Sequence, residues 1–259
     1  MLNFDKFTAS KKNAPKVVLI HGLFGDKDNL SALRKSLQDE YHVLAIDLPN
    51  HGASEHIDKW SFKQVAALLK KTFDAIDFKP DALVGHSLGG KVAMAYALEY
   101  PNDLACAVIA DIAPASYPAR HDNVFNALNA VAAKSINQRA EASDILSATL
   151  KEKATQQFLL KSFKKSQTGW HWQFNLKGLE SDYQALSGWP YDTQSTQTNM
   201  LFVKGQESDY LTTCHTDSVN RHFPNAKVKV IAGTGHWLHA EKPVVFNRIV
   251  TQFLQQTIV

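Results

Sequence analysis

The sequence predicts an α/β fold: a mostly parallel, twisted sheet with helices on both faces and one inserted helical cap. Two observations predict it. Short runs of apolar and β-branched residues alternate with longer amphipathic stretches along most of the chain. The alternation stops between about residues 116 and 195, where no buried-strand pattern occurs, and then resumes. With 259 residues, of which 44% are hydrophobic, the chain is long enough to bury one full core.

Six short apolar runs are the candidate strands, as expected for strands that are buried on both faces. They span residues 16–21, 42–47, 82–85, 105–111, 200–204 and 227–231. Between the second and third runs, residues 62–76 place Val65, Leu69 and Phe73 on one face at helical spacing, which predicts a helix. A last helix is predicted over residues 244–253.

The interruption divides the chain into two predicted units. Residues 1–115 and 196–259 form the core, and residues 116–195 form the cap. Three helix-like segments lie between residues 124 and 165 of the cap. After them, aromatic and polar residues alternate at period 2, which predicts a short strand or an aromatic edge. The aromatic members are Trp170, Trp172 and Phe174.

Composition excludes several classes of protein. The net charge of +3 arises from scattered charges of both signs, so we expect no nucleic-acid partner. No apolar run is long enough to span a bilayer, and no hydrophobic segment follows a basic start, so we expect a cytoplasmic protein. The sequence leaves open whether it is a monomer or a dimer. Cys106 and Cys214 form neither a disulfide framework nor a metal pattern, and we expect two reduced thiols that serve packing.

The segment from Gly85 to Gly90 reads Gly-His-Ser-Leu-Gly-Gly, between an apolar run and a helical stretch. This is the pattern of a nucleophile elbow, a strand-to-helix turn so tight that flanking glycines are needed to avoid clashes. It makes Ser87 the candidate nucleophile. The alternative is a glycine-rich turn with an incidental serine.

A serine hydroxyl needs an adjacent base, and the candidate is His236. It lies in a loop after the last predicted strand, which fits the chain order of nucleophile, acid and histidine in this kind of fold. The alternative is a histidine that only caps or packs. We interpret His86 and His239 as structural.

The tetrahedral intermediate of acyl transfer needs preorganised donors, usually backbone amides. The loop His21-Gly22-Leu23-Phe24-Gly25 follows the first predicted strand and is a candidate for one donor. We assign the amides of Leu23 and of Leu88, the residue after the nucleophile. Phe24 is the second choice for the first donor and a candidate substrate contact.

These motifs resemble those of the α/β-hydrolases, and more narrowly those of the YbfF-type esterases and their mitochondrial relatives. The matching stretches are residues 21–25, 47–54, 85–90, 111–114 and 235–243. The segment Asp111-Ile112-Ala113-Pro114, with Tyr117 and Arg120, is the most family-specific. The resemblance implies hydrolysis of carboxylic esters or acyl thioesters, without a metal or an organic cofactor.

Two aspartates are candidates for the acid that orients His236. In most α/β-hydrolases the acid lies three residues after a glycine that ends the next-to-last strand, but here Ser208 stands three residues after Gly205. Asp209 is one position late. Asp111 ends the strand that follows the elbow strand, and the family resemblance also points to it. We favour Asp111, since one triad geometry can be reached from different chain positions.

The cap is expected to select the substrate, because it covers the nucleophile. Residues 151–165 contain five lysines and one acid, Glu152, which could attract an anionic substrate such as a coenzyme A thioester. A solvated helix face is the commoner cause of such a run. Arg120 is the better candidate, since its planar guanidinium binds a carboxylate or phosphate at two points.

The sequence predicts an esterase or thioesterase that acts on a small-molecule substrate. Other reactions of the same fold, carbon-carbon bond hydrolysis or perhydrolysis, are alternatives. A non-catalytic small-molecule receptor is another, because one pocket can serve either role. Dehalogenation is disfavoured, because it needs a carboxylate where Ser87 stands.

Overall fold

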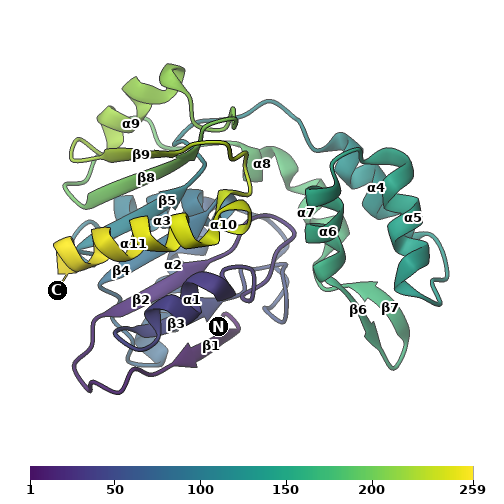
Figure 1. Ribbon diagram of the computed structural model, residues 1–259, viewed down its shortest axis with the longest axis horizontal. Coiled ribbons are helices and arrows are strands. Elements are labelled where there is room, and N and C mark those ends of the chain that lie inside the picture. Colours follow the sequence, from purple (N-terminus) through teal and green to yellow (C-terminus); the bar gives the residue numbers. More distant parts are fainter. Residues whose placement is uncertain (259) are drawn as a thin grey trace.

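The computed structural model describes residues 1–258, and its centre is a sheet of seven strands (Figure 1). The strand order is β1-β3-β2-β4-β5-β8-β9, and every neighbouring pair is parallel except β1 and β3. The strands are β1 (Phe4–Phe7), β2 (Lys16–Ile20), β3 (His42–Ile46), β4 (Ala82–His86), β5 (Cys106–Ala110), β8 (Asn199–Gly205) and β9 (Lys227–Ile231). The predicted mostly parallel sheet is confirmed.

All six predicted strands are present, and their ends differ from the prediction by one residue at most. The additional strand, β1, lies at the edge of the sheet and pairs antiparallel with β3. Its two central residues, Asp5 and Lys6, are charged, so the segment lacks the apolar run that marked the others. An edge strand needs no such run, because it is only partly buried.

Helices cover both faces of the sheet, and the side chains of the central strands alternate between two apolar clusters. One cluster packs against α2 (Phe62–Ala75) and α3 (Leu88–Glu99), the other against α1 (Ser31–Leu37) and α11 (Pro243–Ile258). The remaining core helices are α9 (Thr216–His222), α10 (Leu238–Glu241) and the short 3-10 helix η1 (Thr213–His215). None of the helices described within residues 1–258 is long and apolar enough to cross a membrane.

Two predictions about this part of the chain were wrong in detail. The last helix continues to Ile258, five residues beyond the predicted end, because Leu254 still packs on the core although polar residues follow it. Cys106 is buried in β5 as expected, whereas Cys214 is exposed and does not serve packing.

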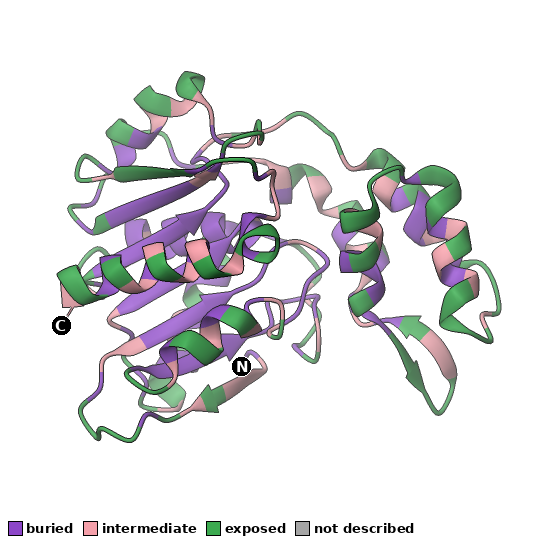
Figure 2. Ribbon diagram, in the orientation of Figure 1, coloured by how far each residue is buried: buried purple, intermediate pink, exposed green. Residues whose placement is uncertain are grey.

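The segment between β5 and β8 adds no strand to the main sheet. It contains α4 (Asp122–Ala132), α5 (Arg139–Thr149), α6 (Lys153–Lys161), β6 (Phe163–Ser166), β7 (Gly169–Trp172), α7 (Leu176–Ser181) and α8 (Tyr183–Ser187). The strands β6 and β7 form a two-stranded antiparallel hairpin, and the predicted aromatic alternation falls on β7 and the residues after it. Figure 2 shows buried residues on the inward sides of the cap helices and exposed residues on their outer sides.

Candidate active site

The turn between β4 and α3 holds Ser87 in the left-handed backbone region, with φ of +52°. The glycines on either side make this turn possible. A Cβ on Gly85 would lie 2.2 Å from the Gly89 carbonyl oxygen, and a Cβ on Gly89 would lie 2.3 Å from the carbonyl oxygen of Ile20. The Ser87 amide donates to the Ala110 carbonyl at 2.9 Å, which ties the turn to β5. The local geometry is that of a nucleophile elbow.

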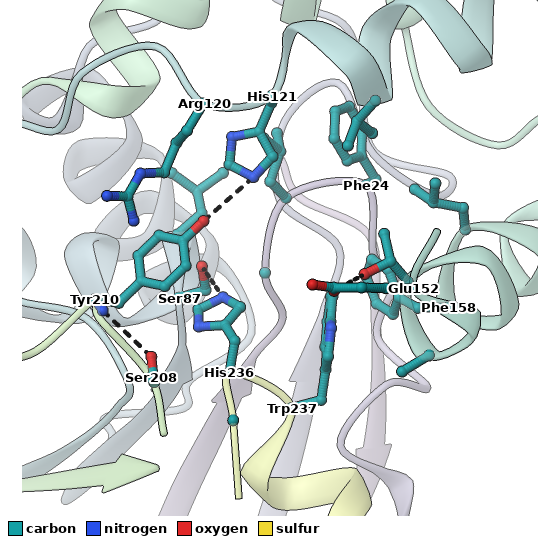
Figure 3. Close-up of a pocket in the computed structure, with 18 of the residues that line it drawn as sticks. Phe24, Ser87, Arg120, His121, Glu152, Phe158, Ser208, Tyr210, His236 and Trp237 are labelled. Carbon is teal, nitrogen blue, oxygen red and sulfur yellow. Dashed lines mark hydrogen bonds between the residues drawn. The ribbon is translucent and has the colours of Figure 1, made fainter. Parts of the chain in front are cut away.

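Three side chains that follow three strands form one line of hydrogen bonds, of which Figure 3 shows the contact between Ser87 and His236. His236 Nε2 lies 3.0 Å from Ser87 Oγ, and His236 Nδ1 lies 2.7 Å from Asp111 Oδ2. Asp111 is fully buried and, like Ser87, has a left-handed backbone, with φ of +53°. A buried carboxylate that accepts from Nδ1 leaves Nε2 able to take a proton from the serine.

Of the two candidate acids, the structure brings only Asp111 to His236. Its Oδ1 atom accepts the Gly205 amide at 3.0 Å, and its Oδ2 atom also accepts the Ser208 hydroxyl. Asp209 instead points outward with 72% of its side chain exposed and pairs with Arg120 at 3.0 Å. Ser208 therefore occupies the position where most α/β-hydrolases carry the acid, and its hydroxyl donates to Asp111, the residue after β5.

Aromatic rings hold His236 from two sides. Tyr210 stacks on it with ring centroids 4.0 Å apart, and the His86 ring lies 4.8 Å away on another side. His86 Nε2 donates to the His236 carbonyl at 2.9 Å. Burial lowers the pKa of His86 well below its ordinary value and that of His239 to about 3, so both rings are neutral packing groups near neutral pH.

Leu23 and Leu88, the residues assigned as oxyanion donors, both line the cavity at Ser87. Within residues 1–258 neither backbone amide makes a hydrogen bond. The Phe24 amide donates to His51 Nε2 at 3.1 Å. Phe24 is therefore excluded as the second-choice oxyanion donor, because its only backbone donor is already used.

The loop that carries Leu23 is held by its own hydrogen bonds. The Gly22 carbonyl accepts the Gly25 amide at 3.1 Å and His21 Nδ1 at 2.7 Å. His21 Nε2 in turn accepts the Leu48 amide at 3.0 Å. Burial lowers the pKa of His21, so the ring is neutral and can donate through one nitrogen while accepting through the other.

A cavity of about 1180 Å³ opens above Ser87 between the core and the cap. One wall is mainly apolar and includes Leu23, Phe24, Val124, Phe158, Leu159 and Trp237. Arg120, His121 and Tyr210 lie on the opposite side, and Glu152 lies beside Phe158 and Trp237 (Figure 3). Lys91 and Tyr183 are further polar residues of the lining. Such a division suits a substrate with an apolar part and a polar part.

The positive charges predicted from the sequence separate in space. Lys151 and Lys153 line the cavity above Ser87, whereas Lys161, Lys164 and Lys165 line a second groove of about 340 Å³ on the cap. Arg120 lines the first cavity, but its guanidinium already has Asp209 as a partner and lies over the Tyr210 ring, 4.8 Å from the centroid. Arg120 remains a candidate substrate contact, although its guanidinium already pairs with the Asp209 carboxylate.

Sequence reasoning missed Lys91, a buried lysine on α3 one helical turn after Ser87. Its Nζ donates to the carbonyls of Ser187 at 2.7 Å and Gly188 at 2.8 Å, where the chain leaves α8. The Tyr117 ring lies 4.8 Å away. Burial lowers the pKa of Lys91 to about 7. Because an isolated lysine within an apolar helix face has no motif, only the fold reveals its partners.

Strand order, elbow and the order of Ser87, Asp111 and His236 along the chain agree with one fold family. The family model described as alpha/beta hydrolase family matches residues 17–249, and the chain belongs to that family. Within it, the chain is 36% identical to esterase YbfF of Escherichia coli over 255 residues, which cover 98% of both chains. This confirms the narrower resemblance to YbfF-type esterases.

Two further relatives agree with this placement. The chain is 32% identical over 263 residues to a zebrafish (Danio rerio) protein named sn-1-specific diacylglycerol lipase ABHD11, covering 98% of this chain and 82% of the relative. A solved structure described as a marine microorganism esterase superposes with a TM-score of 0.92 at 30% identity, covering 98% and 99% of the two chains. Relatives named as esterases and a lipase support ester hydrolysis as the activity.

Proposed function

We propose that the protein is a serine hydrolase that cleaves carboxylic esters through an acyl-enzyme on Ser87. The observation that carries the proposal is the unbroken line of hydrogen bonds from Ser87 through His236 to the buried Asp111. In this arrangement a neutral imidazole accepts the serine proton, and the carboxylate stabilises the imidazolium that forms.

The reaction follows from these positions. Ser87 Oγ attacks the ester carbonyl carbon while its proton passes to His236 Nε2, and the amides of Leu23 and Leu88 donate to the developing oxyanion. His236 then protonates the departing alcohol oxygen as its bond to the acyl carbon breaks. A water molecule attacks the acyl carbon and gives a proton to His236; His236 then returns a proton to Ser87 Oγ as the acyl-oxygen bond breaks, which releases the acid and restores Ser87. No step needs a metal or an organic cofactor.

The cavity supports a substrate with one apolar chain and one polar end. We assign this selection to the cap, residues 116–195, because α4, α6 and the turn between α5 and α6 supply much of the cavity lining. Acyl thioesters fit the same acyl-enzyme chemistry, and Lys151 and Lys153 at the cavity are suitable for an anionic thioester such as an acyl coenzyme A. Turnover of short and long p-nitrophenyl esters beside acyl coenzyme A thioesters distinguishes these classes.

The direct test is labelling with a fluorophosphonate, which reacts quickly only with an activated serine. We expect one label, on Ser87, and we expect Ser87→Ala to lose both labelling and ester turnover. Loss of the nucleophile in a serine protease lowers kcat by about 10⁶. Turnover that persists in Ser87→Ala contradicts the assignment, and a labelled protein that hydrolyses no ester favours the receptor alternative.

A further inference from the structure

Phe24 belongs to the loop of residues 21–25, which we call the oxyanion loop, and it contacts the cap. Its backbone lies in the left-handed region, with φ of +64°, a conformation that a non-glycine residue keeps only when its surroundings hold it. It directly follows Leu23, the candidate oxyanion donor. The backbone conformation of Phe24 therefore fixes the position of the loop and, with it, the position of the Leu23 amide.

Both backbone polar groups of Phe24 are held, and by different parts of the protein. The amide donates to His51 Nε2 at 3.1 Å, within the core. The carbonyl accepts the Ser162 hydroxyl at 2.7 Å, and Ser162 belongs to the cap, between α6 and β6. Ser162 is 1% exposed, and its own carbonyl accepts the Gln173 amide at 2.8 Å. A buried and well-anchored donor fixes its acceptor more firmly than an exposed one does.

The Phe24 side chain is embedded in the cap. The ring is 3% exposed and lies 5.3 Å from Phe125 and 5.2 Å from Phe174, centroid to centroid. The His121 ring meets its edge at 6.4 Å. All three neighbours belong to the cap, and Figure 3 shows Phe24 beside His121, on the far side of the pocket from Tyr210. One core residue is thus bonded and packed to the cap next to the nucleophile.

We propose that the cap completes the oxyanion hole, with Ser162 as a positioning residue that keeps Phe24 in its left-handed conformation and thereby aims the Leu23 amide at the cavity. This inference rests on the proposed function. Ser162 touches no substrate and acts through the loop. Without its hydroxyl the Phe24 carbonyl is buried and unpaired, the left-handed turn relaxes, and the Leu23 donor shifts away from the oxyanion.

The structure offers a matched control for this contact. Asp182, also in the cap, accepts the Trp60 amide of the core at 2.7 Å. Asp182→Ala and Ser162→Ala each remove one side-chain to backbone hydrogen bond between the cap and the core. Only the Ser162 bond ends on the oxyanion loop. A general loosening of the cap affects both variants, whereas a role in the oxyanion hole affects one.

The experiment measures kcat and KM for p-nitrophenyl butyrate, the inhibition constant of an alkyl trifluoromethyl ketone and the Tm of both variants. The ketone forms an oxyanion on Ser87 and so reports the hole directly. For Ser162→Ala we expect kcat to fall and ketone binding to weaken, each about tenfold, with KM within about twofold; losing a whole oxyanion donor costs about 10² to 10³. For Asp182→Ala we expect all three values to stay within about twofold.

The inference is overturned if Ser162→Ala changes kcat and ketone binding no more than Asp182→Ala does, or if it changes KM alone. If Ser162→Ala does not fold, Ser162→Cys keeps the size with a weaker donor, and a kcat equal to that of the unaltered protein overturns the proposal. Failure of the proposed function looks different: the unaltered protein is then neither labelled at Ser87 nor active, and both proposals fall together.

Discussion

The core and the cap meet at the same cavity but hold their residues there by different means. The core presents Ser87, Asp111 and His236 from strand ends and tight turns, with two of the three in left-handed backbone. The cap presents side chains from helices and connecting turns, among them Glu152 and Phe158. In the proposed reaction, the groups that perform the chemistry are fixed by the backbone of a buried sheet, and the groups expected to meet the variable part of a substrate lie on the cap.

The largest expected effect tests the core, by comparing Asp111→Asn with Asp209→Asn. An amide keeps the shape of the side chain but cannot stabilise the imidazolium or hold the useful tautomer, an exchange that costs about 10⁴ in kcat in serine proteases. We expect Asp111→Asn to lose most ester turnover at pH 7 while it stays folded by circular dichroism. Asp209→Asn stays near the unaltered rate, because its carboxylate is exposed and bonded to Arg120.

The reverse pattern would return the acid to the loop after β8. Comparable moderate losses in both variants would mean that either carboxylate can orient His236. Each result changes which part of the core is assigned to the triad, and neither involves the cap.

The sequence predicted the core far better than the cap contacts, for a physical reason. Buried parallel strands require continuous apolar runs, and the elbow requires glycines, so each feature can be identified from a short stretch of sequence. Ser87 was predicted from the elbow pattern, whereas His236 was predicted from its place after the last strand, and Asp111 was favoured over Asp209 from its strand position and the family resemblance; the structure brings the three together. The edge strand β1 has no such pattern, since its central residues are charged.

Contacts between distant segments leave no local pattern. Ser162 reaches Phe24 across 138 positions, and Lys91 reaches Ser187 across 96. A serine at a helix end or a lysine on a helix carries no signal of its partner. Arg120 shows the opposite error: its chemistry suits an anion, but the sequence does not reveal that Asp209 already pairs with it.

A second prediction concerns the stability of the core at acid pH. Burial lowers the pKa of His51 and His239, both in the core, to about 3. These rings stay neutral in the folded protein, whereas in the unfolded chain they take up protons below about pH 6.5. The contribution of these two neutral rings to the free energy of unfolding is therefore fully present above about pH 6.5, and it is lost as the pH falls from there towards 3.

At pH 5 each of these two histidines is expected to lower the free energy of unfolding by about 2 kcal/mol, relative to pH 7.5. Urea unfolding at the two pH values measures the loss, and calorimetry in buffers of different ionisation enthalpy measures the protons taken up. We expect an uptake of about two protons or more on unfolding at pH 5. An unfolding reaction at pH 5 that binds no protons would show that the core histidines are already charged when folded.

The smallest expected effect tests the cap, through Arg120→Ala. Its guanidinium lines the cavity, so a substrate with a carboxylate or phosphate can share it with Asp209. Asp209 already neutralises part of the charge, so we expect a loss of about three- to tenfold in kcat/KM for acyl coenzyme A thioesters, below the roughly tenfold or more that a hydrogen bond to a charged group usually contributes. Neutral p-nitrophenyl esters are expected to change less than about twofold, because they make no use of the charge.

The triple variant Lys161→Ala, Lys164→Ala, Lys165→Ala is the control, since these lysines line the other groove and should alter only the salt dependence of turnover. Equal losses on charged and neutral substrates in Arg120→Ala would make Arg120 a structural partner of Asp209 and Tyr210. An effect of the triple variant as large as that of Arg120→Ala would mean that the long-range field of the cap, and not contact at the cavity, attracts the anion. Specificity for anions would then belong to the cap as a whole rather than to Arg120 at the cavity lining.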